Sequence, residues 1–393
     1  MAAAAAATVA LGAGCAGSPT PPAPGAAATT EPAPPAPGPI AAAPPADAAV
    51  APAPAIDAAP PPPAAAPRLE LTFMGDIMFG GTFNGRFVPQ AVPEHDPLAD
   101  VEALFASDLP LANLETTVVD DIPKELPGNL RFAATPDQVA LLPAHGLTAV
   151  TIANNHANDL DRPGVDETPG HLAELGLHVI GAARPEEPRV RVDTIEVRGW
   201  KLGFVAATAK LNRGQKKADP PIPFVDPDDL GDTLVPVIEA AKADHDLVIV
   251  VLHWGTQYDD APSRWQITAA HRFIDAGAAA VIGHHPHVLQ GIERYHDGVI
   301  AYSLGNFVFQ NAMPRVRDTG VLRLAFEREA RCLDRAVFHP AIERRSPIHH
   351  PEPAKGRDGD EVATRLITLS KAKPLGTTWT RDGDDVVAAG SCP

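Results

Sequence analysis

Three histidines, His284, His285 and His287, stand within four positions of the segment VIGHHPHVLQGIE (281–293), directly after an apolar stretch that ends in glycine. A proline separates His285 from His287, so a stiff turn can present their imidazoles at adjacent corners of one site. Neutral imidazole nitrogens are common protein ligands for divalent metal ions of the manganese, iron and zinc class. The segment therefore predicts a metal site, although a crowded structural loop would have the same pattern.

Four other apolar segments also end in polar residues of the kinds that bind metals or transfer protons. Each segment is a predicted strand, because it is a short run of apolar or alternating residues. In α/β sheets the ligand site lies beyond the carboxyl ends of the strands, so these residues are expected to converge. They are Asp76 after RLELTFMG, Glu115 after PLANL, Asn155 and His156 after TAVTIAN, and His253 after DLVIVVL. Their convergence favours a metal centre over a purely structural histidine cluster.

Helix signals alternate with these strands. Thr135 is a predicted N-cap for a helix that begins at Pro136 and ends at Gly146. Further helices are predicted in DPLADVEALF (96–105), over about 232–243, and in SRWQITAAHRFIDAG (263–277). The alternation predicts an α/β architecture with helix-covered sheets.

Several of these residues also have simpler explanations. Asp76 could hold a turn, and Asn154 and Asn155 could satisfy a strand-to-helix connection. Glu115 is the hardest to explain without a cation, because a carboxylate inside LANLETTVV would lie in an apolar core.

The segment YSLGNFVF (302–309) is a predicted turn with a substrate-facing edge. Ser303 and Asn306 could contact the substrate, although a turn that packs the two phenylalanines explains the segment equally well. The chain has no G-x-S-x-G motif, no glycine-rich phosphate loop and no central cysteine. Hydrolases that use a serine or cysteine nucleophile are therefore excluded.

Composition limits the partners and the folded part of the chain. The formal net charge is −17 over 393 residues, which argues against nucleic acid as a partner. No stretch approaches the roughly 20 continuous apolar residues of a membrane-spanning helix. Residues 16–67 are nearly all alanine and proline and are predicted to be a disordered linker. The remainder is large enough for one substantial core.

The N-terminal segment MAAAAAATVALGAGCAGS resembles the lipid-attachment site of bacterial lipoproteins, with residues 1–15 as the signal segment and Cys15 as the modified residue. It lacks the usual Lys or Arg before the apolar stretch, so an unprocessed alanine-rich tail is the alternative. Lipidation would place the domain outside the cytoplasm, attached to the cell envelope through the lipid alone. Cys332 and Cys392 would then be free to form a disulfide.

Six motifs, in this order and spacing, closely resemble the bacterial CapA family of poly-γ-glutamate capsule synthesis proteins. The resemblance covers roughly residues 69–310, and its motifs are GDIMFGG, ANLETTVV, ANNHANDL, VLHWGTQY, VIGHHPHVLQGIE and YSLGNFVF. The family is similar in turn to calcineurin-type metallophosphoesterases. The resemblance therefore implies a four-layer α/β/β/α sandwich over 68–330, with residues 331–393 as an extension of no predicted role.

The resemblance also implies roles for individual residues. The phosphoesterases hold two divalent metals around a bridging carboxylate and use them to hydrolyse phosphoesters. Carried over to this sequence, the implied metal ligands are Asp76, Glu115 as the bridge, Asn155, His253, His285 and His287. His156 matches the acid that protonates the leaving group.

Two departures from the phosphoesterase pattern alter these expectations. Met78 stands where the pattern has a histidine, so one metal is expected on Glu115 with Asn155, His253 and His285, while the second position keeps a smaller ligand set. Ala157 stands where phosphoesterases carry an acid, so Asp159 is expected to orient His156.

The implied function is capsule or poly-γ-glutamate biosynthesis or export with a metal-dependent hydrolase-like site. The implied partners are an anionic polymer such as poly-γ-glutamate and membrane-bound synthase components. The alternative is a non-catalytic subunit that anchors or binds the polymer, through a metal or through Arg213, Lys216 and Lys217.

Overall fold

The computed structural model describes residues 67–83, 86–92, 94–123, 130–184, 186–212, 221–311 and 313–392. The chain divides into two compact units, Met1–Pro60 and Pro61–Pro393, and all described residues belong to the second. Three features of the sequence analysis lie outside the described residues. They are the predicted lipid-attachment residue Cys15, the Ala/Pro linker up to residue 66, and the basic residues of 213–217 that were predicted to bind the polymer.

The larger sheet has ten strands. In sheet order they are β19 (Thr380–Asp382), β20 (Asp385–Ala389), β17 (Cys332–Arg344), β16 (Asp318–Glu327), β1 (Arg68–Ile77), β4 (Leu109–Leu114), β7 (Ala149–Thr151) and β8 (His178–Ile180), with β15 (Asn306–Val308) beside β1 and β18 (His350–Pro353) beside β17. Strands β1, β4, β7, β8 and β15 run parallel to one another. On the other side of β1, the pairs β1–β16, β16–β17, β17–β20 and β19–β20 are antiparallel. The parallel half therefore brings the carboxyl ends of β1, β4 and β7 to one edge of the sheet.

The smaller sheet has six strands. They are, in sheet order, β13 (Ile292–Tyr295), β14 (Gly298–Ala301), β12 (Ala280–His284), β11 (Leu247–His253), β10 (Trp200–Thr208) and β9 (Val192–Val197). The four central strands are parallel and the two edge strands are antiparallel. The strand β11, LVIVVLH, is buried along its whole length, as expected of a parallel strand that is covered on both faces.

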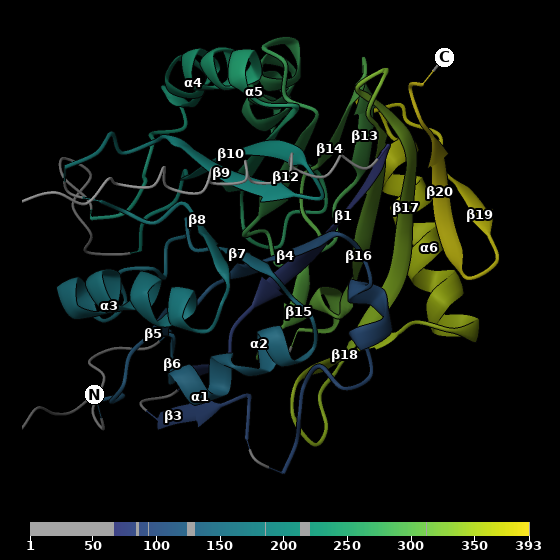
Figure 1. Ribbon diagram of the computed structural model, residues 1–393. Coiled ribbons are helices and arrows are strands. Elements are labelled where there is room, and N and C mark those ends of the chain that lie inside the picture. Colours follow the sequence, from purple (N-terminus) through teal and green to yellow (C-terminus); the bar gives the residue numbers. More distant parts are fainter. Residues whose placement is uncertain are drawn as a thin grey trace, which may run out of the picture. The chain divides into compact units, whose positions relative to one another are not determined.

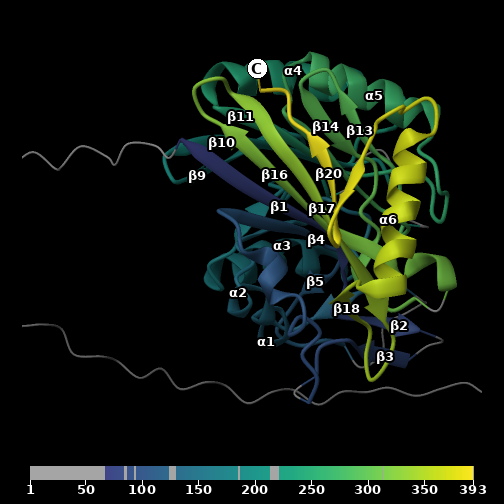
Figure 2. The same cartoon turned by 90° about the vertical axis from the view of Figure 1, so that its right-hand side faces the viewer.

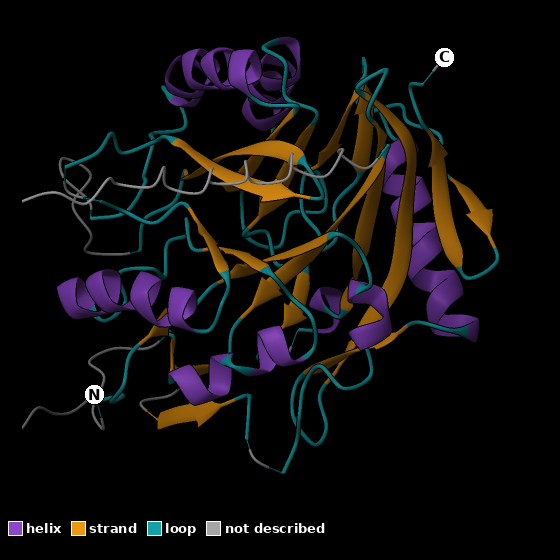
Figure 3. Cartoon of the chain, in the orientation of Figure 1, coloured by secondary structure: helices purple, strands orange, loops and turns teal. Residues whose placement is uncertain are grey.

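Helices cover the outer face of each sheet (Figures 1, 2 and 3). The helices α4 (Leu230–Asp244) and α5 (Arg264–Asp275) lie on the smaller sheet, and α1 (Pro136–Val139), α2 (Leu141–Ala144) and α3 (Asp161–Glu174) lie on the larger one. The main apolar cluster fills the space between the sheets, with Phe73 from β1 and Phe204 from β10 both fully buried. The predicted α/β/β/α class is confirmed.

Local signals agree with the observed helices in one case and fail in another. Thr135 forms a capping box at the start of α1, and Gly146 has a φ of 88° after α2. The helix predicted over 96–105 is wrong, because only Glu102–Phe105 forms a 3₁₀ turn (η1). Asp96 accepts a hydrogen bond from the Leu98 N–H (2.9 Å), and such a side-chain turn competes with helix formation.

Residues after 330 complete the larger sheet, a role that was not predicted from the sequence. β17 pairs with β16 and β20, and the helix α6 (Gly356–Lys371) contacts β17 and β20 of the larger sheet and β13 of the smaller one. Cys332 and Cys392 form a disulfide across a sequence separation of 60 residues. The C-terminal segment is therefore an integral part of the second unit.

The remaining elements are short. They are the two-stranded sheets β2 (Gly80–Phe83) with β3 (Arg86–Pro89) and β5 (Thr117–Val118) with β6 (Ala133–Ala134), and the 3₁₀ turn η2 (Pro314–Val316). Among the described residues, no helix combines the length and apolar character needed to cross a membrane.

Candidate metal centre

The carboxyl ends of strands from both sheets meet at one place. Asp76, near the end of β1, lies beside Asn113 of β4, and His253 at the end of β11 lies beside His284 at the end of β12. Asp76 Oδ1 is 3.0 Å from His284 Nδ1, which joins the two sheets directly. The predicted convergence at strand ends is therefore what the structure shows.

Glu115 lies at the middle of this group, directly after β4. Its side chain is fully buried, and its Oε1 lies 3.6 Å from His156 Nε2, 3.7 Å from His253 Nε2 and 3.9 Å from His287 Nε2. These distances are too long for hydrogen bonds. Neither carboxylate oxygen has a hydrogen-bond partner in the described part of the chain.

Asp76 is held more tightly. Its Oδ1 accepts a hydrogen bond from Asn113 Nδ2 (2.9 Å), and its Oδ2 accepts one from the His285 N–H (3.3 Å). His287 Nδ1 lies 3.3 Å from the same Oδ2. Asp76 therefore organises the histidine loop as well as offering an oxygen to the centre.

The histidine loop has an unusual backbone. His285 and His287 have φ angles of 95° and 58°, in the left-handed region that residues other than glycine rarely adopt. Each such residue costs of order 1–3 kcal/mol and persists only where its surroundings impose it. Here the Asp76 carboxylate holds the His285 N–H, and the Tyr258 N–H donates to the Pro286 carbonyl (2.8 Å). Strained residues of this kind cluster at functional sites.

His253 and His285 form a neutral pair. His285 Nδ1 lies 3.0 Å from His253 Nε2. Burial, and then the nearby imidazole of His285, lowers the pKa of His253 well below its usual range. Burial also lowers the pKa of His285, and the charges of His287 and Lys210 lower it further. Neutral imidazole is the form that binds metals.

The two carboxylates differ in their pKa. Burial alone would raise the pKa of Asp76, but hydrogen bonds with His284 and His287 hold it well below the usual range. Burial, and then the charges of Asp76 and Asp159, raises the pKa of Glu115 well above its usual range. Glu115 is therefore a buried acid whose ionised form lacks a counter-charge.

His156 lies on one side of Glu115 in a network of its own. Its Nδ1 is 2.5 Å from Asp159 Oδ2, and its ring stacks on Phe132 with centroids 3.8 Å apart. Asn212 donates to Asp159 Oδ1 (3.0 Å) and lies 3.3 Å from His156 Nδ1. The expected contact between Asp159 and His156 is present, and it leaves the Nε2 of His156 facing Glu115.

These residues fit a divalent metal ion. Ligand atoms of Asp76, Glu115 and His253 all lie within 4.8 Å of one another. The carboxylate oxygens of Glu115 have no donor among the described residues, and burial lowers the pKa of His253 and His285 and so favours their neutral form. Carboxylate oxygen with neutral imidazole nitrogen is donor chemistry that suits manganese, iron and zinc. A cation at this place would supply the missing counter-charge.

The other predicted ligand and substrate residues have varied surroundings. The Asn155 amide donates to Asn212 Oδ1 (2.5 Å), and Asn306 Oδ1 lies 2.9 Å from His287 Nδ1. Asn154 is fully buried, and its amide donates to Asn113 Oδ1 and to the Leu114 carbonyl. Their roles as ligand or substrate residues stay predictions.

Ser303 has a structural contact within its own turn, and its role as a substrate residue stays a prediction. It is fully buried, and its hydroxyl accepts a hydrogen bond from the Gly305 N–H (3.2 Å), so it closes the turn of YSLGNFVF. Met78, which replaces a histidine of the phosphoesterase pattern, is buried in an apolar cluster with Phe132 and Phe309.

Sequence reasoning missed three residues of the centre. His284 belongs to the histidine cluster but was not assigned a ligand role, and its ring contacts Asp76. Asn113 lies at the tip of a predicted strand, two residues before Glu115, and this position could have identified it. Asn212 lies in a polar loop after β10, and no sequence signal distinguishes it.

Comparison with known proteins identifies the family of the chain. Residues 70–311 match the family model described as bacterial capsule synthesis protein PGA_cap. The PGA biosynthesis protein CapA of Bacillus subtilis is 33% identical over 263 residues, which are 65% of this chain and 67% of that protein. The capsule biosynthesis protein CapA of Bacillus anthracis is 31% identical over 265 residues, 65% of this chain and 63% of that protein.

Solved structures give a weaker likeness. A phosphatase of Mycoplasma pneumoniae matches with 13% identity and a TM-score of 0.42, covering 71% of this chain and 95% of that chain. A 5′-nucleotidase precursor of Thermus thermophilus matches with 15% identity and a TM-score of 0.38, covering 77% of this chain and 58% of that chain. The sequence match, which spans more than half of the chain, decides the assignment: the chain belongs to the bacterial capsule synthesis protein PGA_cap family.

Proposed function

We propose that the chain is an accessory protein of capsule or poly-γ-glutamate synthesis whose centre binds a divalent metal ion and acts as a hydrolase or transferase on an anionic polymer. The observation that carries the proposal is the Glu115 carboxylate. It is fully buried, accepts no hydrogen bond within the described residues, and faces three imidazole nitrogens. Burying an ionised carboxylate without a partner is costly, so a cation is the physical explanation for its place.

The residues of the chain would divide the work among them. Glu115, Asp76, Asn155 and the histidines His253, His285 and His287 would hold the metal. A bound divalent ion supplies Lewis-acid chemistry for hydrolysis.

His156 is suited to hold a proton for the leaving group. Its Nδ1 lies against the Asp159 carboxylate, which can accept the Nδ1 hydrogen and so fix the ring. The Nε2 then faces the centre, 3.6 Å from Glu115 Oε1.

The names of the relatives support the proposal that the chain acts on an anionic polymer. Two relatives are named for PGA or capsule biosynthesis, and a relative from Mycobacterium tuberculosis, 29% identical over 258 residues, is named a probable polyglutamine synthesis accessory protein. By analogy, the partners would be an anionic polymer such as poly-γ-glutamate and membrane-bound synthase components.

A location outside the cytoplasm, with a lipid anchor at Cys15, is part of the same proposal. The Cys332–Cys392 disulfide supports it, because disulfides persist in oxidising compartments.

A non-catalytic role in binding or anchoring the polymer is the second candidate. Met78 favours it, because this buried apolar residue stands where the phosphoesterase pattern has a metal ligand. A centre with an incomplete ligand set could bind carboxylates of the polymer through one metal without turning them over.

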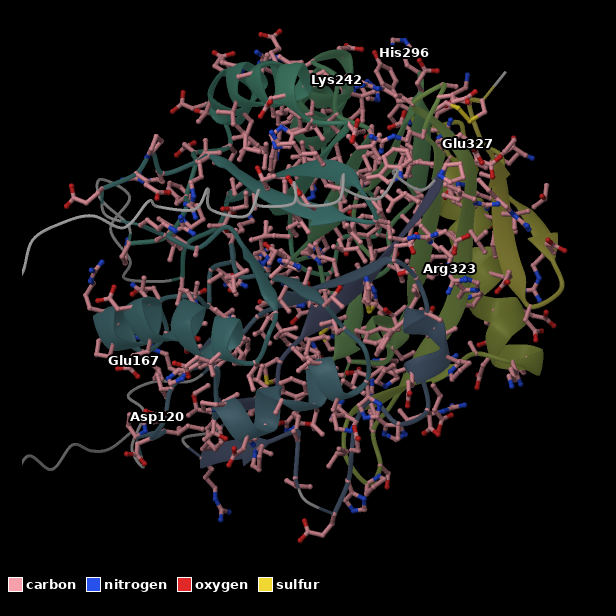
Figure 4. All side chains as sticks on the ribbon, in the orientation of Figure 1. Asp120, Glu167, Lys242, His296, Arg323 and Glu327 are labelled. Atoms are coloured by element: carbon pink, nitrogen blue, oxygen red, sulfur yellow. A yellow bond between two sulfur atoms is a disulfide. The ribbon has the colours of Figure 1, made fainter. Side chains whose placement is uncertain are left out.

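The test compares the purified chain with a variant in which His253 and His285 are both alanine. Turnover of a generic phosphodiester and of poly-γ-glutamate is measured with and without manganese, and metal content is measured by elemental analysis. The proposal expects manganese-dependent turnover and bound metal in the unchanged chain and the loss of both in the double variant. His296→Ala, at an exposed histidine labelled in Figure 4, is the control.

The outcomes separate the two candidates. Manganese-dependent retention of poly-γ-glutamate without turnover favours the binding subunit. Full metal occupancy in the double variant contradicts the proposed centre.

A further inference from the structure

The segment after β10 runs along one side of the metal centre. Thr208 lies beside His253 in the sheet register, and the Ala209 N–H donates to the His253 carbonyl (2.9 Å). The Thr208 hydroxyl bonds both the Lys210 carbonyl (3.1 Å) and the His253 carbonyl (3.3 Å). The backbone up to Lys210 is therefore fixed to the strand that carries a predicted ligand.

The same segment reaches the proton-holding network two residues later. Asn212 donates to Asp159 Oδ1 (3.0 Å) and lies 3.3 Å from His156 Nδ1. Lys210 thus stands between two anchored positions, one on His253 and the other on His156.

Lys210 is half-buried, and the Thr208 hydroxyl joins its backbone to that of His253 at the edge of the centre. Within the described part of the chain, Lys210 forms no ion pair, whereas Lys201 of β10 pairs with Asp244. A half-buried ammonium without a counter-ion is costly, so it indicates a group that receives an anion.

We propose that Lys210 binds an oxyanion of the substrate, phosphate or carboxylate, beside the metal centre. This inference rests on the proposed function, and it adds that the substrate carries a negative charge next to the bond that is worked on. An ammonium group supplies a point charge and up to three hydrogen-bond donors, which suits either oxyanion. Lys210 would therefore select anionic substrates over neutral ones.

The test measures anion binding separately from metal binding. Manganese affinity of the full chain is measured first by calorimetry, and the manganese-loaded chain is then titrated with inorganic phosphate and, separately, with penta-γ-glutamate. The variants are Lys210→Gln, which removes the charge, and Lys210→Arg, which keeps it. Lys242→Gln is the matched control, because Lys242 is also half-buried but lies on α4 in the outer helix layer (Figure 4).

The expected result is specific to Lys210. Lys210→Gln keeps the manganese affinity within about twofold and weakens binding of at least one anion by about tenfold or more, as expected when a charge-assisted hydrogen bond is lost. Lys210→Arg recovers most of that affinity, and Lys242→Gln changes neither anion. The anion that responds tells whether the oxyanion belongs to a phosphoester or to a γ-glutamyl polymer.

Other outcomes overturn the proposal. It fails if Lys210→Gln binds both anions as tightly as the unchanged chain, or if the manganese-loaded unchanged chain binds neither anion. In the second case manganese binding still supports the proposed centre. If the chain does not bind manganese, the proposed function fails, and the same titrations on the metal-free chain still decide whether Lys210 binds anions.

Discussion

Replacing Glu115 by glutamine should stabilise the metal-free chain and remove most of the stabilisation that manganese gives. The substitution keeps the shape of the side chain and removes its charge. The raised pKa of Glu115, caused by burial and then by Asp76 and Asp159, means that the folded state binds its proton more tightly than the unfolded state. The contribution of Glu115 to the stability of the metal-free chain is therefore fully present below the usual glutamate pKa and is lost as the pH rises through the raised pKa.

Without metal, the variant should be the more stable protein at about pH 7. The free energy of unfolding should rise by about 1–3 kcal/mol, because the neutral amide of glutamine is less costly to bury than an ionised carboxylate.

With metal, the unchanged chain should gain stability that the variant does not. Manganese at about 100 times its dissociation constant stabilises a folded protein that binds it by about 2.7 kcal/mol. For a folded unit of about 330 residues, an unfolding entropy near 2 cal/mol/K per residue converts this to about 4 °C in Tm. Loss of the charged ligand should weaken binding by about 100-fold, and this reduces the gain to about 0.4 kcal/mol, below about 1 °C.

The assay is thermal unfolding of both chains after chelation and after addition of manganese. Glu293→Gln is the matched control, because this buried glutamate accepts a hydrogen bond from the Tyr302 hydroxyl (2.6 Å) and lies 3.0 Å from His271 Nε2. The Glu293→Gln variant should be less stable than the unchanged chain with and without manganese, and manganese should still raise its Tm as it does for the unchanged chain. The reasoning is refuted if Glu115→Gln keeps that gain or destabilises the metal-free chain as the control does.

Three further predictions follow from other contacts. His156→Gln should lower turnover by about 100-fold without changing manganese affinity; unchanged turnover would exclude proton donation by this residue. Burial alone would lower the pKa of His145, but hydrogen bonds with Asp96 and Glu102 and their charges raise it. These contacts therefore stabilise the folded chain fully below the usual histidine pKa, and the stabilisation is lost as the pH rises through the raised pKa. His145→Gln should therefore cost under about 1 kcal/mol at about pH 6 and almost nothing at about pH 9 in urea unfolding; an equal cost at both would refute the assignment. Cys332→Ser should lower the unfolding free energy by about 4 kcal/mol under oxidising conditions, given a loop of 60 residues, and a reducing agent should abolish the difference.

The ends of parallel strands could be predicted from the sequence. Apolar runs such as LVIVVLH are recognisable because both faces of a parallel strand are buried, and the polar residue that follows marks the edge of the sheet. This rule is sufficient to bring Asp76, Glu115 and His253 together.

Orientations within loops could not be predicted. Which imidazoles of the histidine cluster face Asp76 depends on the left-handed backbone of His285 and His287, and no local pattern signals that conformation. The motif of Ser303 likewise gives no sign that its hydroxyl accepts a hydrogen bond from the Gly305 N–H.

Pairing between distant segments also could not be predicted from the sequence. The strands of residues 332–389 complete the larger sheet by antiparallel pairing, which depends on contacts far apart in the chain. The position of Asn212 against Asp159 depends on the way in which β10 and β7 end in different sheets.

The most direct measurement is anomalous diffraction at the manganese edge from crystals of the full chain grown with manganese. The account predicts a peak within about 2.3 Å of a Glu115 carboxylate oxygen and a His253 imidazole nitrogen. No peak at this place, or a peak only at another acidic group such as Asp100, His350 and Glu352, would contradict it.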